Sequence, residues 1–296
     1  MAAQYLKAVV DSGEYQLMDD YAELFAFGTK NCAESVFEIQ HSNLFPSDWS
    51  WYEGNGIVQL CGIRGLCSDD QLYAPGWGFM PLTKDLNDHF LADDQYRRDA
   101  AIIDEAELAS QLSSPTSCKS ALDLSQVNAY DYEGFWQQKY ANFRAYNGDN
   151  VNGGDPNLTK DPNTYSIRYA DVLLMLAEAL TRGTGSQSEA MTYIDMVRER
   201  AAGPGDNSGN FTTAQNLMTQ QNWSLLDVIW YERRAELAGE GDRWFDLVRS
   251  GRATADLFGA EKGANFSQEK IYLPISYDET TVAKNITTYP DAGLFE

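Results

Sequence analysis

The chain has 296 residues, of which 43% are hydrophobic and 12% aromatic, so it can bury a substantial core and global disorder is excluded. Its 44 acidic residues against 22 basic ones give a net charge of −22, which disfavours nucleic acids and anionic membrane surfaces as direct partners. Two histidines, and four cysteines with no C-x-x-C pair, argue against a structural zinc site. No run of about 18 apolar residues offers a membrane-spanning helix.

The chain begins with a predicted helix over residues 2–11, which Gly13 ends. The stretch MAAQYLKAVVDSGEYQL has no apolar core of a signal peptide and looks like an amphipathic helix already in progress. We therefore expect any export signal or lipid anchor to be missing from this chain. A short helix at DYAELF and a strand or extended piece at SVFEIQ follow.

Residues 41–80 are predicted to be an aromatic, loop-rich region, with HSNLFPSDWSWYEGNG and LYAPGWGFMP as its clearest stretches. Cys61 and Cys67 lie six positions apart there, either as a disulfide in an oxidising compartment or as two free thiols. A helix over 83–94 follows, with Thr83 as its N-cap. Residues 96–104 then suggest a strand.

Residues 130–144 alternate enough for a strand or an aromatic-lined connection, and 147–163 form the clearest polar linker of the chain. The aspartates and asparagines of 147–155 offer oxygen ligands for calcium but lack EF-hand spacing, so no metal and no cofactor are predicted.

The helical signal is strongest after residue 164. The apolar stripe of the first helix (165–182) recurs at three- and four-residue spacing through Ile167, Ala170, Leu174, Ala177 and Leu180, with Gly183 just past its end. A second helix in 188–203 has Ala190, Ile194 and Val197 on its inner face. Two antiparallel helices of about 34 residues in total, with small alanines at close approaches, are typical of a tetratricopeptide repeat.

A third helix over 223–251, with a possible break at Gly239–Gly241, contains the arginine-rich stretch 231–252. Glu232, Glu236 and Glu240 share one face, and Arg233 lies three residues before Glu236. Arg243 and Arg249 likewise follow Glu240 and Asp246 by three. Because acids balance bases beside large aromatics, we interpret this segment as an internal ionic brace. An anion site and a catalytic carboxylate pair are the alternatives.

Several motifs resemble the SusD/RagB family. ERRAELAGEGDRWFDLVRSG, preceded by IRYADVLLMLAEAL and EAMTYIDMVRER and followed by YLPI at 272–275, matches that family's C-terminal pattern. AAQYLKAVVDSGEYQL, GWGFMPLTKDL and DDQYRRDAAII resemble it more loosely. Val248 and Ser250 depart from the residues usual in the family. The chain looks like the C-terminal portion of a member, without the lipoprotein signal and some N-terminal repeats.

The resemblance implies a mainly α fold, in which tetratricopeptide-like helix pairs pack against an irregular loop-rich region with a few short strands. We expect three segments: the end of the repeat helices (1–40), an aromatic ligand-binding region (41–164) and the C-terminal helical region (165–296). It also implies a non-catalytic, lipid-anchored protein on the outer-membrane surface. Such a protein captures oligosaccharides or polysaccharides and delivers them to a SusC-like TonB-dependent transporter, in a starch-utilisation-like uptake system.

Sugar binding needs flat aromatic faces together with polar groups for the hydroxyls, and 41–80 supplies both. The candidate ligand-binding residues are Trp49, Trp51, Tyr52, Tyr73, Trp77, Asp48 and Asn55. Trp49 and Trp51, two apart in an extended segment, would face the same way. The alternatives are loop or transporter contacts for these residues and turn packing for Trp77. A second candidate cluster for ligand contact is Tyr130, Tyr132, Phe135 and Trp136, for which core packing is the favoured interpretation.

Two other functions stay open at this point. A repeat scaffold of the same fold would bind a peptide or partner helix on its helical pair. A glycoside hydrolase would use a carboxylate pair that includes Glu236.

Overall fold

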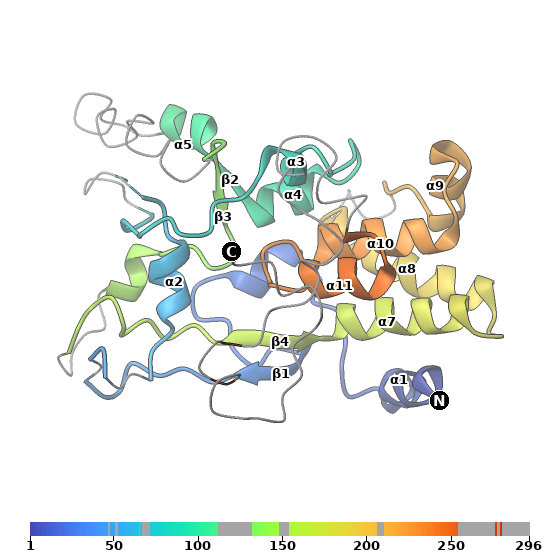
Figure 1. Cartoon of the computed structure of the whole chain (residues 1–296), viewed down its shortest axis with the longest axis horizontal. Helices are drawn as coiled ribbons and strands as arrows, with labels where there is room; N and C mark the ends of the chain where they lie inside the picture. The colour runs from blue at the N-terminus through green and yellow to red at the C-terminus, as the bar shows by residue number, and fades with distance from the viewer. Residues whose placement is uncertain are drawn as a thin grey trace. The chain divides into compact units, whose positions relative to one another are not determined.

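Three helices enclose the largest hydrophobic core of the computed structural model. Helices α7 (Tyr169–Arg182) and α8 (Gln187–Ala201) run side by side, and α10 (Leu225–Glu236) packs against both (Figure 1). The fully buried side chains at their centre include Leu173, Leu174, Leu176, Ile194 and Ile229. The sequence prediction of a helix pair with a small-residue seam is confirmed.

The structure describes residues 1–46, 48–50, 53–64, 66, 72–111, 132–147, 154–205, 210–253, 276 and 279. The chain divides into two units, Met1–Glu240 and Gly241–Glu296, and each is described by itself. The three-segment organisation expected from the sequence stays a prediction. The YLPI motif at 272–275 lies outside the described residues.

The N-terminal elements follow the sequence prediction closely. Helix α1 (Ala2–Ser12) ends at Gly13, whose φ of 69° is left-handed, and it contacts α7. The short 3₁₀ helix η1 (Tyr21–Phe25) is capped by the side chain of Asp20, which accepts a hydrogen bond from the amide of Ala22.

A two-stranded antiparallel ribbon precedes α7. Strand β1 (Ser35–Ile39) pairs with β4 (Thr164–Arg168), and Phe37 lies opposite Ile167. The helix predicted from residue 165 therefore begins only at Tyr169, and Ile167 belongs to the ribbon instead of the helical core. Pairing with β1 overrides the helical spacing of the apolar residues at this end.

The region between residues 56 and 147 holds shorter elements. They are α2 (Gly56–Cys61), α3 (Lys84–Asn87), α4 (Gln95–Ala101), β2 (Ile102–Asp104), α5 (Glu105–Gln111), β3 (Phe135–Gln137) and η4 (Arg144–Asn147). Strand β2 pairs antiparallel with β3, and Thr83 caps α3 as predicted. The strand predicted over 96–104 is wrong for most of its length: residues 95–101 form helix α4, which buries Arg97 among carboxylates. Trp136 of β3 is 1% exposed, as its assignment to core packing requires.

The predicted third helix breaks where its glycines stand. Helix α10 ends at Glu236 and α11 (Arg243–Ser250) begins after Gly239 and Gly241, whose φ angles of 77° and 103° suit glycine. Helix α9 (Ala214–Gln221) was not predicted. Within α11, Arg249 pairs with Asp246 at 2.7 Å, as the i, i+3 spacing predicted.

The carboxylates on α10 form a buried ion network with arginines of other elements. Glu236 is 0% exposed and contacts the guanidinium groups of Arg168 at 2.9 Å, Arg200 at 2.5 Å and Arg97 at 3.1 Å. Glu232 contacts Arg97 and Arg198 at 2.5 and 2.8 Å. The network joins α4, β4, α8 and α10, so the interpretation as an internal brace is confirmed for this part of the segment.

The partners within the network differ from those that helical spacing suggested. Arg233 pairs with Asp171 of α7 at 2.5 Å, not with Glu236. Glu240 contacts Arg168 and Lys139 at 2.7 and 2.6 Å. Helical spacing shows which charges share a face, but only the packing of other elements decides what they meet.

The network also sets protonation states. Burial alone would raise the pKa of Glu236, but the guanidinium groups of Arg200, Arg168 and Arg97 outweigh it and hold that pKa far below its ordinary value. Glu240 has a lowered pKa because Arg168 and Lys139 similarly outweigh its burial. Burial lowers the pKa of Lys139 to about 8.

Candidate functional site

An aromatic loop at 75–79 is fixed to the end of α2 by backbone hydrogen bonds. The amides of Trp77 and Phe79 donate to the carbonyls of Gln59 and Leu60, each at 2.9 Å. These carbonyls belong to the last turn of α2 and have no partner within the helix. The loop therefore completes the helix end, and the two aromatic residues are held by their own main chain.

Glycines allow this close approach. A Cβ on Gly76 would lie 2.3 Å from the Cα of Gly62, far inside van der Waals contact. Gly78 adopts a φ of +64°, and a Cβ there would lie 2.7 Å from the Trp136 ring. Positions 76 and 78, on either side of Trp77, therefore have room only for glycine.

Trp49 stacks on Trp77. Their ring centroids lie 5.5 Å apart with an interplanar angle of 14°, and the Phe79 ring lies 5.8 Å from Trp77 at 54°. Trp49 is 59% exposed and Phe79 is 54% exposed. We call Trp49, Trp77 and Phe79 the tryptophan platform. It displays a broad aromatic surface of the kind that packs against the C–H face of a sugar ring.

Hydrogen bonds orient the outer indole. Trp49 donates through Nε1 to Oδ2 of Asp155 at 2.8 Å, while Oδ1 of Asp155 accepts from the amide and side chain of Asn157, both at 2.9 Å. Asp48 is exposed beside Trp49 and accepts from the amide of Ser50 at 2.7 Å. Carboxylates thus lie next to aromatic faces, a combination that suits sugar hydroxyls.

The structure separates the sequence candidates into two groups. Trp49, Trp77 and Asp48 lie at or beside the platform. Asn55 is 0% exposed and caps α2, accepting from the amide of Ile57 and donating to Pro162 and Thr164. Tyr73 is 6% exposed and donates its hydroxyl to Gln138 at 2.7 Å. We therefore leave Asn55 and Tyr73 out of the proposed site.

Trp51 and Tyr52 lie outside the described residues, so their orientation stays a prediction. Asp155 and Phe79 were not singled out from the sequence. The Asp-Pro-Asn order at 155–157 is a turn signal, and Asp155 was considered only as an oxygen ligand within the 147–155 stretch. Its contact with Trp49 spans 106 positions, which no local pattern reveals.

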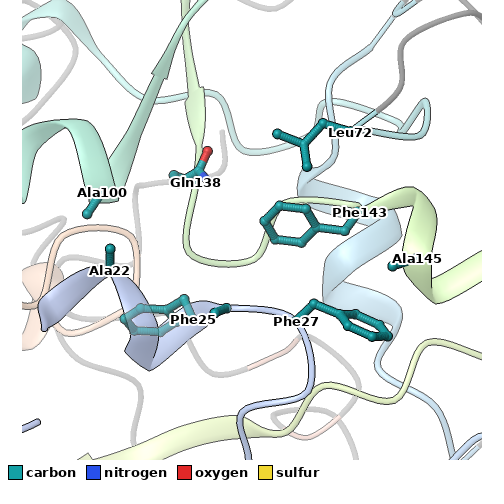
Figure 2. Close-up of a pocket in the computed structure, with 9 residues that line it drawn as sticks. Ala22, Phe25, Phe27, Leu72, Ala100, Gln138, Phe143 and Ala145 are labelled. Carbon is teal, nitrogen blue, oxygen red and sulfur yellow. The ribbon is translucent and has the colours of Figure 1, made fainter.

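A separate apolar pocket of about 390 Å³ lies between η1, α4 and the segments around Leu72 and Phe143 (Figure 2). Nine of the described residues line it: Ala22, Phe25, Ala26, Phe27, Leu72, Ala100, Gln138, Phe143 and Ala145. We call it the phenylalanine pocket. It draws its walls from four distant stretches of sequence, and the sequence analysis did not predict it.

The described residues contain no group of three histidine, cysteine or acidic side chains placed to hold a metal ion. Most of the 147–155 loop lies outside that part of the chain. Cys61 is a buried free thiol, whose pKa burial raises to about 12, and its suggested partner Cys67 is not described. No described helix has the length and apolar character needed to span a membrane.

Two of the alternative functions meet structural obstacles. Glu236, proposed as a hydrolase carboxylate, is inaccessible and paired with three arginines. The inner side of the α7–α8 pair is filled by Val228 and Ile229 of α10, both 0% exposed, where a peptide-binding groove would have to be open.

These features define a class before any comparison: a mainly α protein, built on tetratricopeptide-like helices and an ion network, that displays an aromatic surface from its loops. A family model described as the SusD family matches residues 112–291. The chain belongs to the SusD family. SusD-like protein P2 of Formosa agariphila is 29% identical over 266 residues, which cover 88% of this chain and 48% of that protein.

Solved structures agree with this assignment. Surface glycan-binding protein A from Bacteroides thetaiotaomicron superimposes with a TM-score of 0.76 at 26% identity, covering 97% of this chain and 58% of that one. The same protein in complex with laminarihexaose superimposes with a TM-score of 0.76 at 27% identity, with the same coverage of both chains. A laminarin-binding SusD-like protein gives 0.70 at 29%, covering 94% and 54%. The chain thus spans about half the length of the relatives it matches.

Proposed function

We propose that this chain is part of a non-catalytic cell-surface protein that captures an oligosaccharide on the tryptophan platform. The observation that carries the proposal is the stacked Trp49–Trp77 pair, in which the exposed Trp49 ring packs on Trp77, whose main chain is fixed to α2. A rigid aromatic surface loses little conformational entropy when a sugar ring packs on it. The neighbouring Asp48 and Asp155 supply acceptors for hydroxyl groups.

The family relationship supports the same proposal. Two of its structural relatives are described as binding glycans or laminarin, and one was solved with laminarihexaose. We extend the proposal to the whole protein: anchored by lipid at the outer-membrane surface, it would pass the captured glycan to a SusC-like TonB-dependent transporter.

Affinity electrophoresis against a panel of polysaccharides tests the capture step. The wild-type chain is compared with the double variant Trp49→Ala/Phe79→Ala, which removes two exposed platform rings. A matched control, Phe37→Ala/Ile39→Ala, removes two side chains of similar exposure (58% and 51%) from the β1–β4 ribbon. We expect retardation by at least one glycan in the wild type and the control, and its loss in the platform variant.

Retardation by no member of the panel, with the full-length protein included, contradicts glycan capture. Equal retardation of the platform variant and the wild type places the site elsewhere. For delivery, co-purification of the full-length protein with a TonB-dependent transporter is expected, and its absence in the native membrane contradicts that part.

A further inference from the structure

The phenylalanine pocket is held open by its own packing. Phe25 is wedged edge-on between Tyr140 and Tyr165, with centroid distances of 5.7 and 5.4 Å. Phe27 and Phe143 both pack on Tyr146, at 5.1 and 5.9 Å. Because each ring is fixed from behind, the walls have little freedom to fold inward and close the space.

The lining leaves space in the middle. Four of the nine described lining residues are alanines, whose methyl groups leave the middle of the pocket unfilled (Figure 2). Phe25 is 9% exposed, whereas Phe27 and Leu72 are 50% and 54% exposed. Phe25 therefore lies deepest, and the other two form the rim. The volume of about 390 Å³ falls within the range of about 300–1,000 Å³ that small-ligand pockets occupy.

Gln138 has the one polar side chain among the nine described lining residues. The side-chain oxygen of Gln138 accepts the hydroxyl proton of Tyr73, so the amide nitrogen is left as a donor. That nitrogen makes no hydrogen bond to any residue that the structure describes. None of the nine described lining residues is charged, so an ionised ligand would find no opposite charge among them.

This chemistry restricts the ligand. A sugar ring would set several hydroxyl groups against phenylalanine and alanine, and among the described lining side chains only Gln138 offers a hydrogen bond. A flat apolar ring matches the three aromatic walls, and one acceptor on it matches Gln138. We propose that the phenylalanine pocket binds an uncharged aryl ester, with its ring among Phe25, Phe27 and Phe143 and its carbonyl oxygen accepting from Gln138.

The pocket contains its own reporters. The methyl groups of Ala22, Ala26, Ala100 and Ala145 line it, while Ala170 and Ala177 lie in the α7 core at 0% exposure. In a protein with ¹³C-labelled alanine methyls, titration with methyl benzoate is expected to shift the four pocket signals and leave the two core signals unchanged. Ethylbenzene, which lacks the acceptor, is expected to bind roughly five- to tenfold more weakly, the factor of one neutral hydrogen bond. The benzoate anion is expected not to bind.

Three variants test the assignment. Gln138→Glu keeps an acceptor for the Tyr73 hydroxyl but removes the amide donor. The affinity for methyl benzoate should therefore fall to that for ethylbenzene. Ala145→Leu fills the space and should abolish binding of both probes. Trp49→Ala alters only the tryptophan platform and should leave both affinities unchanged, which separates this proposal from glycan capture. The core alanine signals report whether each variant is folded.

A second probe, an aryl ester attached to a sugar, tests whether the pocket takes a free ester or one carried by a sugar. Methyl 6-O-benzoyl-β-glucopyranoside binding at least as tightly as methyl benzoate would mean that the pocket accepts aryl esters attached to sugars. Binding of methyl benzoate alone would mean that it takes the free ester. The proposal is overturned if methyl benzoate leaves the pocket alanines unshifted up to its solubility limit, or if Ala145→Leu binds it as well as the wild type does.

Discussion

The buried ion network gathers charged side chains, and the tryptophan platform gathers aromatic ones. The network stabilises the scaffold, whereas the platform is available to a ligand. In the network, Glu236 meets three guanidinium groups and is 0% exposed, so its charge is already neutralised by protein. On the platform, Trp49 stacks on Trp77 and donates one hydrogen bond to Asp155, but it is 59% exposed. A group whose interactions are all made internally contributes to the scaffold, whereas a rigid group with a free face is available to a ligand.

The sharpest test of this contrast is Glu236→Gln. It removes the carboxylate that the buried guanidinium groups of Arg168, Arg200 and Arg97 share and leaves them only their other acidic partners, so we expect the free energy of unfolding to fall by about 3–5 kcal/mol. Urea denaturation followed by circular dichroism measures it. The control Glu189→Gln breaks the exposed pair with Lys7, and its effect should stay below about 1 kcal/mol. Similar losses for the two variants would contradict a special role for the network.

The second-largest effect is expected from low pH, which should weaken the ion network. The pKa values of Glu236 and Glu240 are lowered in the folded protein, so the stability they contribute is fully present above the unfolded value of about 4.3. It is lost as the pH falls from there towards the folded values, by up to about 1.4 kcal/mol per pH unit for each group. Urea midpoints between about pH 6 and about pH 3 measure the slope. Glu240→Gln should flatten it, and an unchanged slope would contradict the assignment.

Trp49→Ala should weaken glycan binding and leave stability nearly unchanged, whereas the network variants should lose stability. We expect glycan affinity to fall by about 2 kcal/mol, roughly 30-fold, as for a central tryptophan in a binding surface. The unfolding free energy should change by less than about 0.5 kcal/mol, because the side chain is mostly exposed. Isothermal titration with whichever glycan the panel identifies, together with urea denaturation, gives both numbers. A large loss of stability with unchanged affinity would make Trp49 a structural residue.

The smallest effect is expected for Asp155→Ala. Losing the hydrogen bond to Trp49 Nε1 leaves the indole free to rotate, and ordering it on binding should cost about 1 kcal/mol of affinity. Asp155 acts as a positioning residue, so the tryptophan fluorescence of the free protein should also change. The control Asp19→Ala, at an exposed position far from the platform in the sequence, should alter neither signal. Unchanged fluorescence and affinity would show that Trp49 is held by stacking alone.

Sequence reasoning succeeded where interactions are local in the chain. The stripes of α7 and α8, the cap at Thr83 and the break at Gly239–Gly241 depend on neighbours within a few positions. It failed for residues 96–101, where helix α4 replaces the predicted strand. It also failed for Ile167, because β1, more than 120 positions away, recruits that stretch into a ribbon. Those outcomes depend on packing partners that no window of sequence contains.

The candidate site divides in the same way. Trp49, Trp77 and Asp48 could be chosen from the sequence because aromatic and acidic residues are concentrated in 41–80. That Tyr73 and Asn55 are buried, that Asp155 holds Trp49, and that a phenylalanine pocket exists could not be predicted.

By itself the sequence determined a helical repeat scaffold, an ionic brace on α10 and an aromatic loop region, because residue type and short spacing govern helix faces, charge balance and turns. Only the tertiary structure decided which arginine meets which glutamate, and which aromatic rings are displayed and which are buried. The reason is physical: whether a side chain is desolvated depends on segments that arrive from elsewhere in the chain, and desolvation is what separates a brace from a binding surface.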